Sequence, residues 1–119
     1  MEGFLQSLKF KNPDMQVEVC KLVGFAAKKK GKGKDWKTDQ TLYWRGEGIK
    51  RDSKEYQELL DRAYGELSKN SGFRKALLAS GDATLTHSIG RNKENETILT
   101  NREFCSRLMR IRSEIKEIF

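Results

Sequence analysis

The sequence predicts an α+β fold that is mainly α: a multihelical single domain, residues 1–119, with a minor β element. Three observations predict it. Apolar residues recur at helical spacing in several segments. Residues typical of strands gather only in two short runs, Thr41–Ile49 and Thr84–Ile89. A chain of 119 residues has room for one modest core.

The charge balance points to a negatively charged partner. Lys and Arg number 24 against 17 Asp and Glu, which gives a net charge of +7. Such a chain attracts nucleic acid, phosphorylated ligands or an anionic membrane surface, and the charge alone does not choose among them. No apolar run reaches membrane-spanning length and no signal peptide precedes the first helix, so we expect a cytoplasmic protein with no membrane partner.

Cysteine and histidine are too sparse to form a metal site. Cys20 and Cys105 belong to no CxxC pair, and we expect both to be buried free thiols in a reducing compartment. His87 is the single histidine, so the sequence holds no metal-ligand cluster. We expect neither a metal nor a cofactor.

The first helix is expected within Met1–Lys11, because three apolar residues, Phe4, Leu5 and Leu8, share one side of it. A polar row made of Glu2, Gln6 and Lys9 lies on a neighbouring face. That row is either a solvated surface or the wall of a pocket. We favour the solvated surface, since most charged side chains are exposed.

The second helix is expected to start at Asn12-Pro13-Asp14, where Asn can cap and Pro tolerates the first turn. Its predicted buried stripe is Val17, Cys20 and Leu22, with Gly24 as the stop.

A basic run follows in Phe25–Lys37, with six lysines, two glycines and Trp36. It is either a phosphate-binding loop with an aromatic stacking partner, or an exposed linker whose Trp folds back on the core. We favour the linker. It is not a P-loop, since no GxxxxGK[ST] pattern occurs.

Thr41–Ile49 is predicted to form a short strand or extended segment followed by a turn. Within it, Trp44 belongs either to the core or to a ligand pocket. Asp52 or Ser53 is expected to cap the strongest helix, which runs to about Lys69 with apolar residues at helical spacing: Tyr56, Leu59, Leu60, Ala63, Tyr64 and Leu67.

A shorter helix is predicted over Phe73–Ser80, with Leu77 and Leu78 buried and Gly81 as its stop. The last helix is expected to start with a capping box, in which Thr100 and Glu103 bond each other's backbone amides. It runs to about Lys116 with a buried stripe: Phe104, Leu108, Ile111 and Ile115. The simpler interpretation of the flanking Arg110 is surface charge, and the alternative is a place near a ligand.

The segment before this helix carries candidate site residues. His87, in the strand-like run, is either a general base or a plain structural residue. The short basic loop Gly90–Lys93 presents Arg91, Asn92 and Lys93, which suit phosphate binding. A solvated turn explains the loop about as well.

Taken together, three stretches resemble the NADAR superfamily and its YbiA-like members. Glu2, Gln6 and Lys9 match its first motif, Leu77–Asp82 its Leu-Leu-x-Thr-Gly-Asp segment, and Leu108–Arg112 its final helix. The bacteriophage branch is the most similar, through the stretch Leu99–Cys105. The resemblance implies a multihelical α+β fold and hydrolysis of an N-glycosidic bond in an ADP-ribose-linked or related nucleotide substrate. It assigns Glu2 as the carboxylate, Lys9 as a phosphate partner and Gln6 as an orienting group.

The chain departs from that pattern late in the sequence. His87 stands where the family carries a Glu, and Asn92 where it carries an Asp. The family's N-terminal strand region is also missing before Glu2, so we expect a domain that lacks it.

Two functions follow, with a third behind them. The first is an N-glycosidase with Glu2 and His87 as catalytic residues and a substrate site made of Gln6, Lys9, Trp44, Arg91, Asn92 and Lys93. It requires Glu2 and His87 to share one cleft. The second is a non-catalytic phage protein that binds a nucleotide or nucleic acid through its basic surface. The third is a phage accessory protein that binds a host protein. The expected partner is a nucleotide or ADP-ribose-type small molecule, with nucleic acid as the alternative, in the host cytoplasm.

Overall fold

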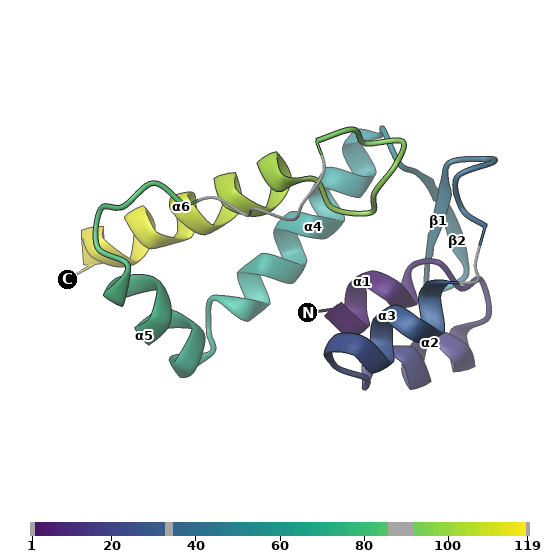
Figure 1. Cartoon of the computed structure of the whole chain (residues 1–119), viewed down its shortest axis with the longest axis horizontal. Coiled ribbons are helices and arrows are strands. Elements are labelled where there is room, and N and C mark those ends of the chain that lie inside the picture. Colours follow the sequence, from purple (N-terminus) through teal and green to yellow (C-terminus); the bar gives the residue numbers. More distant parts are fainter. Residues whose placement is uncertain (1, 33–34, 86–91, 119) are drawn as a thin grey trace. The chain divides into compact units, whose positions relative to one another are not determined.

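A computed structural model describes residues 2–32, 35–85 and 92–118 of the chain. Within these residues it contains six helices and one two-stranded antiparallel sheet, which confirms the mainly helical α+β class (Figure 1). The elements are, in order, α1 (Glu2–Ser7), α2 (Pro13–Cys20), α3 (Gly24–Lys32), β1 (Thr41–Trp44), β2 (Glu47–Lys50), α4 (Lys54–Leu67), α5 (Ser71–Ala79) and α6 (Asn101–Ile118).

The chain forms two compact units, and each is assembled from two separate stretches of sequence. The first unit is Met1–Tyr56 with Glu94–Ile98, and the second is Gln57–Lys93 with Leu99–Phe119. In the part of the chain that the structure describes, no helix is long and apolar enough to cross a membrane.

Three helices, α1, α2 and α3, pack against one another in the first unit (Figure 1). Asn12 caps α2 as predicted, because its Oδ1 accepts hydrogen bonds from the amides of Asp14 and Met15 at 2.8 and 3.4 Å. α1 comes very close to the end of α2 at Gly3. A Cβ added there would lie 2.3 Å from the carbonyl oxygen of Leu22. Only glycine fits this contact.

The two strands form a tight hairpin, with Leu42 opposite Ile49 and Trp44 opposite Glu47. Arg45 and Gly46 make the two-residue turn with φ of 52° and 85°, which is the backbone of a type I′ turn. The hairpin is tied to α2 by Gln16, whose Nε2 donates to the carbonyl of Tyr43 at 2.6 Å and whose Oε1 accepts from the amide of Arg45 at 3.2 Å.

The predicted buried face of α2 is wrong. Val17 is 56% exposed and Cys20 is exposed, while Gln16 and Val19 are buried instead. The reason is the pairing of Gln16 with the hairpin backbone, which turns that side of the helix inward. Cys105 is only partly buried, so the expectation of two buried thiols is wrong as well.

The basic run is helical over most of its length, because α3 covers Gly24–Lys32. The expected linker is therefore wrong, and Gly24, with φ of 52°, begins α3 rather than ending α2. The other part of that favoured interpretation is confirmed: Trp36 folds back on the core and is 5% exposed.

The second unit contains most of α4, together with α5 and α6. Its core is Tyr64, Leu77, Ile111 and Ile115, flanked by partly buried Leu67, Phe73, Leu85, Phe104 and Leu108. The predicted stripes of α4 and α6 are thus confirmed in outline. Leu78 is 38% exposed, so its predicted burial is wrong, since the short α5 turns one face, with Leu77, to α6.

Side chains cap the N-termini of α4 and α6. The capping box of α6 is confirmed: the Thr100 amide donates to Glu103 Oε1 at 2.7 Å, and the Glu103 amide donates to Thr100 Oγ1 at 3.1 Å. Ser53 caps α4 by accepting from the Tyr56 amide at 3.2 Å. Arg110 lies at the surface, 3.3 Å from Asp61, in agreement with its simpler interpretation.

Candidate functional site

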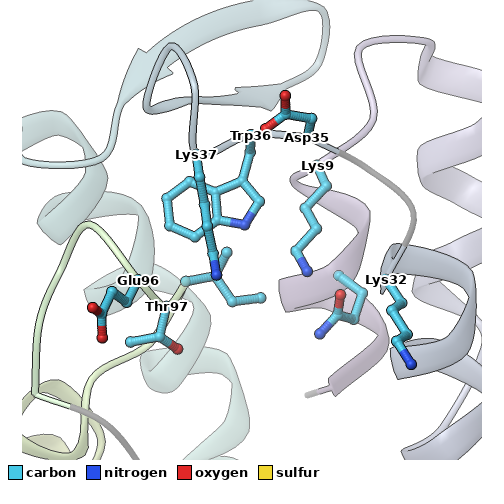
Figure 2. Close-up of a pocket in the computed structure, with 9 residues that line it drawn as sticks. Lys9, Lys32, Asp35, Trp36, Lys37, Glu96 and Thr97 are labelled. Atoms are coloured by element: carbon cyan, nitrogen blue, oxygen red, sulfur yellow. The ribbon is translucent and has the colours of Figure 1, made fainter.

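A cavity of about 500 Å³ lies within the first unit. Figure 2 shows residues from four segments around it. The first segment holds Gln6 of α1 and Lys9 just after it, and the second holds Lys32 at the end of α3. The third is the stretch Asp35–Lys37 and the fourth is Glu96–Ile98.

Three lysines from separate segments give the cavity its character. Figure 2 shows Lys9, Lys32 and Lys37 around the same hollow. Burial lowers the pKa of Lys9; the charge of Glu2 opposes that shift and the positive charge of Lys37 adds to it. The ammonium group of Lys9 is therefore poorly solvated, and an anion beside it would stabilise its positive charge.

Two carboxylates, Asp35 and Glu96, also line the cavity. Asp35 is already engaged, since its Oδ2 accepts from Thr38 Oγ1 at 2.6 Å and its Oδ1 from the Thr38 amide at 3.3 Å. These hydrogen bonds lower the pKa of Asp35 and keep it ionised. The lining thus holds three cations against two carboxylates.

Gln6 is the buried polar residue of the lining, with 7% of its surface exposed. Its Nε2 donates to Glu2 Oε1 at 2.9 Å, one helical turn earlier. Its Oε1 is buried and has no hydrogen-bond partner among the residues that the structure describes. A Cβ at residue 31 would lie 1.9 Å from this oxygen, so the glycine there makes room for the amide.

Glu96–Ile98 of the lining belong to the stretch Glu94–Ile98, which returns to this unit from far along the chain. Side chains of the first unit donate to three of its carbonyl oxygens: Gln40 Nε2 to Asn95 at 3.0 Å, Arg51 Nε to Thr97 at 2.8 Å, and Tyr56 Oη to Ile98. These bonds fix the part of the cavity that is most distant in sequence.

The structure brings only some of the predicted site residues together. Gln6 and Lys9 line the cavity, and Glu2 stands behind Gln6 without lining it. Their polar row is thus partly a pocket wall, the alternative that we did not favour. Trp44 lies elsewhere, with its ring 5.4 Å from that of Phe4 and 5.4 Å from the Arg45 guanidinium.

The described part of the late basic loop, Asn92 and Lys93, is exposed and belongs to the second unit. His87 and Arg91 lie outside the described residues, so the shared cleft of Glu2 and His87 stays a prediction.

Several lining residues were missed by the sequence analysis. Lys32, Trp36 and Lys37 belong to the basic run whose phosphate-binding alternative we noted but did not favour. Thr97 and Ile98 carry no signal in the sequence, because long-range folding alone brings them to the site.

Comparison with known proteins gives a bacteriophage family. A family model described as "Bacteriophage protein GP30.3" matches residues 1–113. A protein of Enterobacteria phage T4, "Uncharacterized 17.1 kDa protein in Gp30-rIII intergenic region", is 39% identical over 118 residues, which are 97% of this chain and 78% of the T4 protein. No solved structure matches.

These matches overturn the resemblance to the NADAR superfamily and confirm a bacteriophage protein. The motifs that suggested NADAR are short, and most of their residues are common on any amphipathic helix, such as the Leu and Arg residues of Leu108–Arg112 in the middle of α6.

Proposed function

This chain belongs to the bacteriophage GP30.3 protein family, and we propose that it is a non-catalytic binding protein for a nucleotide or a nucleic-acid segment. The ligand is held by its phosphates in the cavity of the first unit. The observation that carries the proposal is that Lys9, Lys32 and Lys37, from separate segments of the chain, line the same cavity.

Size and charge both support a phosphate-bearing ligand. A volume of about 500 Å³ lies in the range of small-molecule sites. Lysine binds phosphate as a flexible point charge, and Lys32 and Lys37 are exposed enough to reach a ligand at the mouth. The net charge of +7 steers polyanions toward the protein as a whole.

Binding has better support than hydrolysis of a glycosidic bond. That reaction needs a carboxylate next to the sugar, either to stabilise the oxocarbenium-like state or to activate water. Glu2 does not line the cavity and is hydrogen-bonded to Gln6, while Asp35 is bonded to Thr38. We also propose that the protein acts in the host cytoplasm, where such a ligand occurs.

The proposal is tested by calorimetric titration with ADP and by fluorescence anisotropy with a labelled single-stranded oligonucleotide. Lys32→Gln is the variant and Lys29→Gln its control, since both lysines lie on α3 and only Lys32 lines the cavity. We expect Lys32→Gln to weaken ADP about fivefold to tenfold and to lower the salt slope for the oligonucleotide by roughly one. Lys29→Gln should stay within about twofold of the wild type for ADP, because an exposed charge outside the site adds little.

Three results would contradict the proposal. One is no binding of ADP or the oligonucleotide at low salt. Another is an equal loss in both lysine variants, which would mean that the charge acts without a site. The third is release of a free base from ADP-ribose or an ADP-ribosylated oligonucleotide by the wild type and not by Glu2→Gln, which would make the protein an enzyme.

A further inference from the structure

We infer that Gln6 selects the ligand, and that its carboxamide oxygen accepts a hydrogen bond from an N–H or O–H group of a base or sugar. The cavity then takes a whole nucleotide unit in preference to a bare phosphate. This inference rests on the proposed function of the same cavity and adds the part of the ligand that the lysines do not bind.

The orientation of the Gln6 amide is fixed by Glu2. An ionised carboxylate only accepts hydrogen bonds, so the group facing Glu2 Oε1 at 2.9 Å must be the amide nitrogen. The reverse orientation would place two acceptors against each other. Glu2 is thus a positioning residue, which leaves the carbonyl oxygen of Gln6 as the group that still needs a donor.

That oxygen has no donor in the described parts of the chain, although Gln6 is 93% buried by its 7% exposure. Buried polar atoms without a partner are rare in folded proteins, and an unmet one calls for an explanation. The fold makes room for this atom: glycine at position 31 removes the side chain that would otherwise occupy its place. An apolar residue at position 6 would fill the same space without an unmet acceptor.

The lysines and Gln6 divide the recognition between them. Phosphate oxygens of a nucleotide accept hydrogen bonds, so they suit Lys9, Lys32 and Lys37 but cannot satisfy Gln6 Oε1. Bases carry amino and imino N–H groups, and ribose carries hydroxyls, and these are donors. Gln6 lines the cavity, so a ligand bound there lies next to its amide.

The test compares affinities within one protein. Calorimetry at pH 8 measures pyrophosphate, ribose 5-phosphate and the four common nucleoside 5′-monophosphates, and the readout is the ratio of nucleotide to pyrophosphate affinity. We expect the wild type to favour at least one nucleotide about tenfold, the selectivity that one well-placed hydrogen bond gives. In Gln6→Met, which keeps the length of the side chain, that ratio should fall at least about fivefold.

Gln57→Met is the matched control, because Gln57 Nε2 also donates to a glutamate, Glu103 Oε2, at 2.7 Å and Gln57 lies in the second unit. It should lose stability without changing the ratio. Glu2→Gln should lower the ratio too. An amide at position 2 can donate as well as accept a hydrogen bond, so the Gln6 amide could then adopt the reverse orientation. A change of stability alone would move neither ratio.

The outcomes separate the inference from the function on which it rests. If pyrophosphate binds and the nucleotides bind no better, or if Gln6→Met keeps the wild-type ratio, the selective role of Gln6 is wrong and the phosphate site stands. If neither pyrophosphate nor any nucleotide binds the wild type, the phosphate site is wrong and the inference falls with it.

Discussion

The Arg51 guanidinium lies 4.7 Å from the centre of the Tyr56 ring, and neither side chain has any exposed surface. Both donate to consecutive residues of the cavity wall: Arg51 Nε to the carbonyl of Thr97 at 2.8 Å, and Tyr56 Oη to that of Ile98. A buried cation over an aromatic face gains more than an exposed one. The shape of the candidate site therefore depends on two residues that no ligand would touch.

Tyr56→Phe should destabilise the protein by about 1–2 kcal/mol, because it leaves the buried Ile98 carbonyl without its donor while preserving the ring. Unfolding in guanidinium chloride would measure this loss of free energy, provided that the dependence of the unfolding free energy on denaturant concentration is the same in both proteins. Tyr43→Phe, at a half-buried position in β1, is the control and should cost less than about 0.5 kcal/mol. Equal losses in the two variants would rule out a special role for the Tyr56 hydroxyl.

The sequence predicted those parts of the fold whose signals are local. The helix around Tyr64, the cap at Asn12 and the capping box of Thr100 and Glu103 all follow from spacing or from side chains within one turn. The buried face of α2 did not follow, because Gln16 pairs with the hairpin, 27 residues away at Tyr43. A polar residue that is buried by a distant backbone partner leaves no periodic trace.

Gly3→Ala should destabilise the protein by about 1–3 kcal/mol, as overpacking commonly does. The atoms within 3 Å of the added Cβ are the backbone carbonyls of Val19, Cys20 and Leu22, which cannot rotate away. Gly65→Ala is the opposite case, since it lies within α4 with nothing within 4 Å. It should stabilise by about 0.5–1 kcal/mol, and thermal melts of both variants should shift in opposite directions.

Gly31→Ala should act on binding more than on stability. The nearest atom to the new Cβ, at 1.9 Å, is the Oε1 end of the Gln6 side chain, which can move. The shifted amide would lose its place in the cavity, so we expect the ratio of nucleotide to pyrophosphate affinity to fall about as far as in Gln6→Met, on the order of fivefold. A full wild-type ratio together with a normal melting temperature would contradict this placement of Gln6.

Thr100→Ala should cost about 1 kcal/mol, because the Glu103 amide loses the hydroxyl that caps α6 at 3.1 Å. Thr100→Ser keeps the hydroxyl and should recover most of the loss. Urea unfolding of both variants gives the difference directly. If serine is no better than alanine, the lost methyl group and not the cap explains the cost.

The stability of the protein should rise with pH on the alkaline side of neutrality, through the effect of Lys9. Its pKa in the folded protein is lowered from 10.5, first by burial, so between the two pKa values the unfolded chain holds more protons than the folded one. Stability then increases as pH rises through that window and levels off above 10.5. Melting temperatures of the wild type and Lys9→Met should show this gain in the wild type alone.

Bound phosphate should reverse the shift, since an anion beside Lys9 favours its charged form. Titration in buffers of different ionisation enthalpy should therefore show proton uptake on binding in the alkaline range, and Lys9→Met should lose it. No proton uptake in the wild type would place the phosphate away from Lys9.

The candidate site was less predictable than the fold. The row of Glu2, Gln6 and Lys9 was found by helical spacing, but spacing could not tell which members face a cavity. Lys32 and Lys37 could be placed at the site only once the conformation of the basic run was known. Glu96–Ile98 could be placed there only once the structure showed that a segment about forty residues beyond Tyr56 returns to the first unit. A single sequence therefore predicts local features of a site, such as helical spacing, but not the long-range contacts that complete it.

The interleaved order of the two units has a consequence for synthesis and for dissection of the gene. Because Glu94–Ile98 completes the first unit and Leu99–Phe119 completes the second, a ribosome must translate as far as Ile98 before either unit has all its parts. Expressing the two halves as separate fragments would leave at least one of them unfinished wherever the cut is made. At most one fragment of such a pair holds a complete unit, so assembly of both units requires complementation of the two fragments.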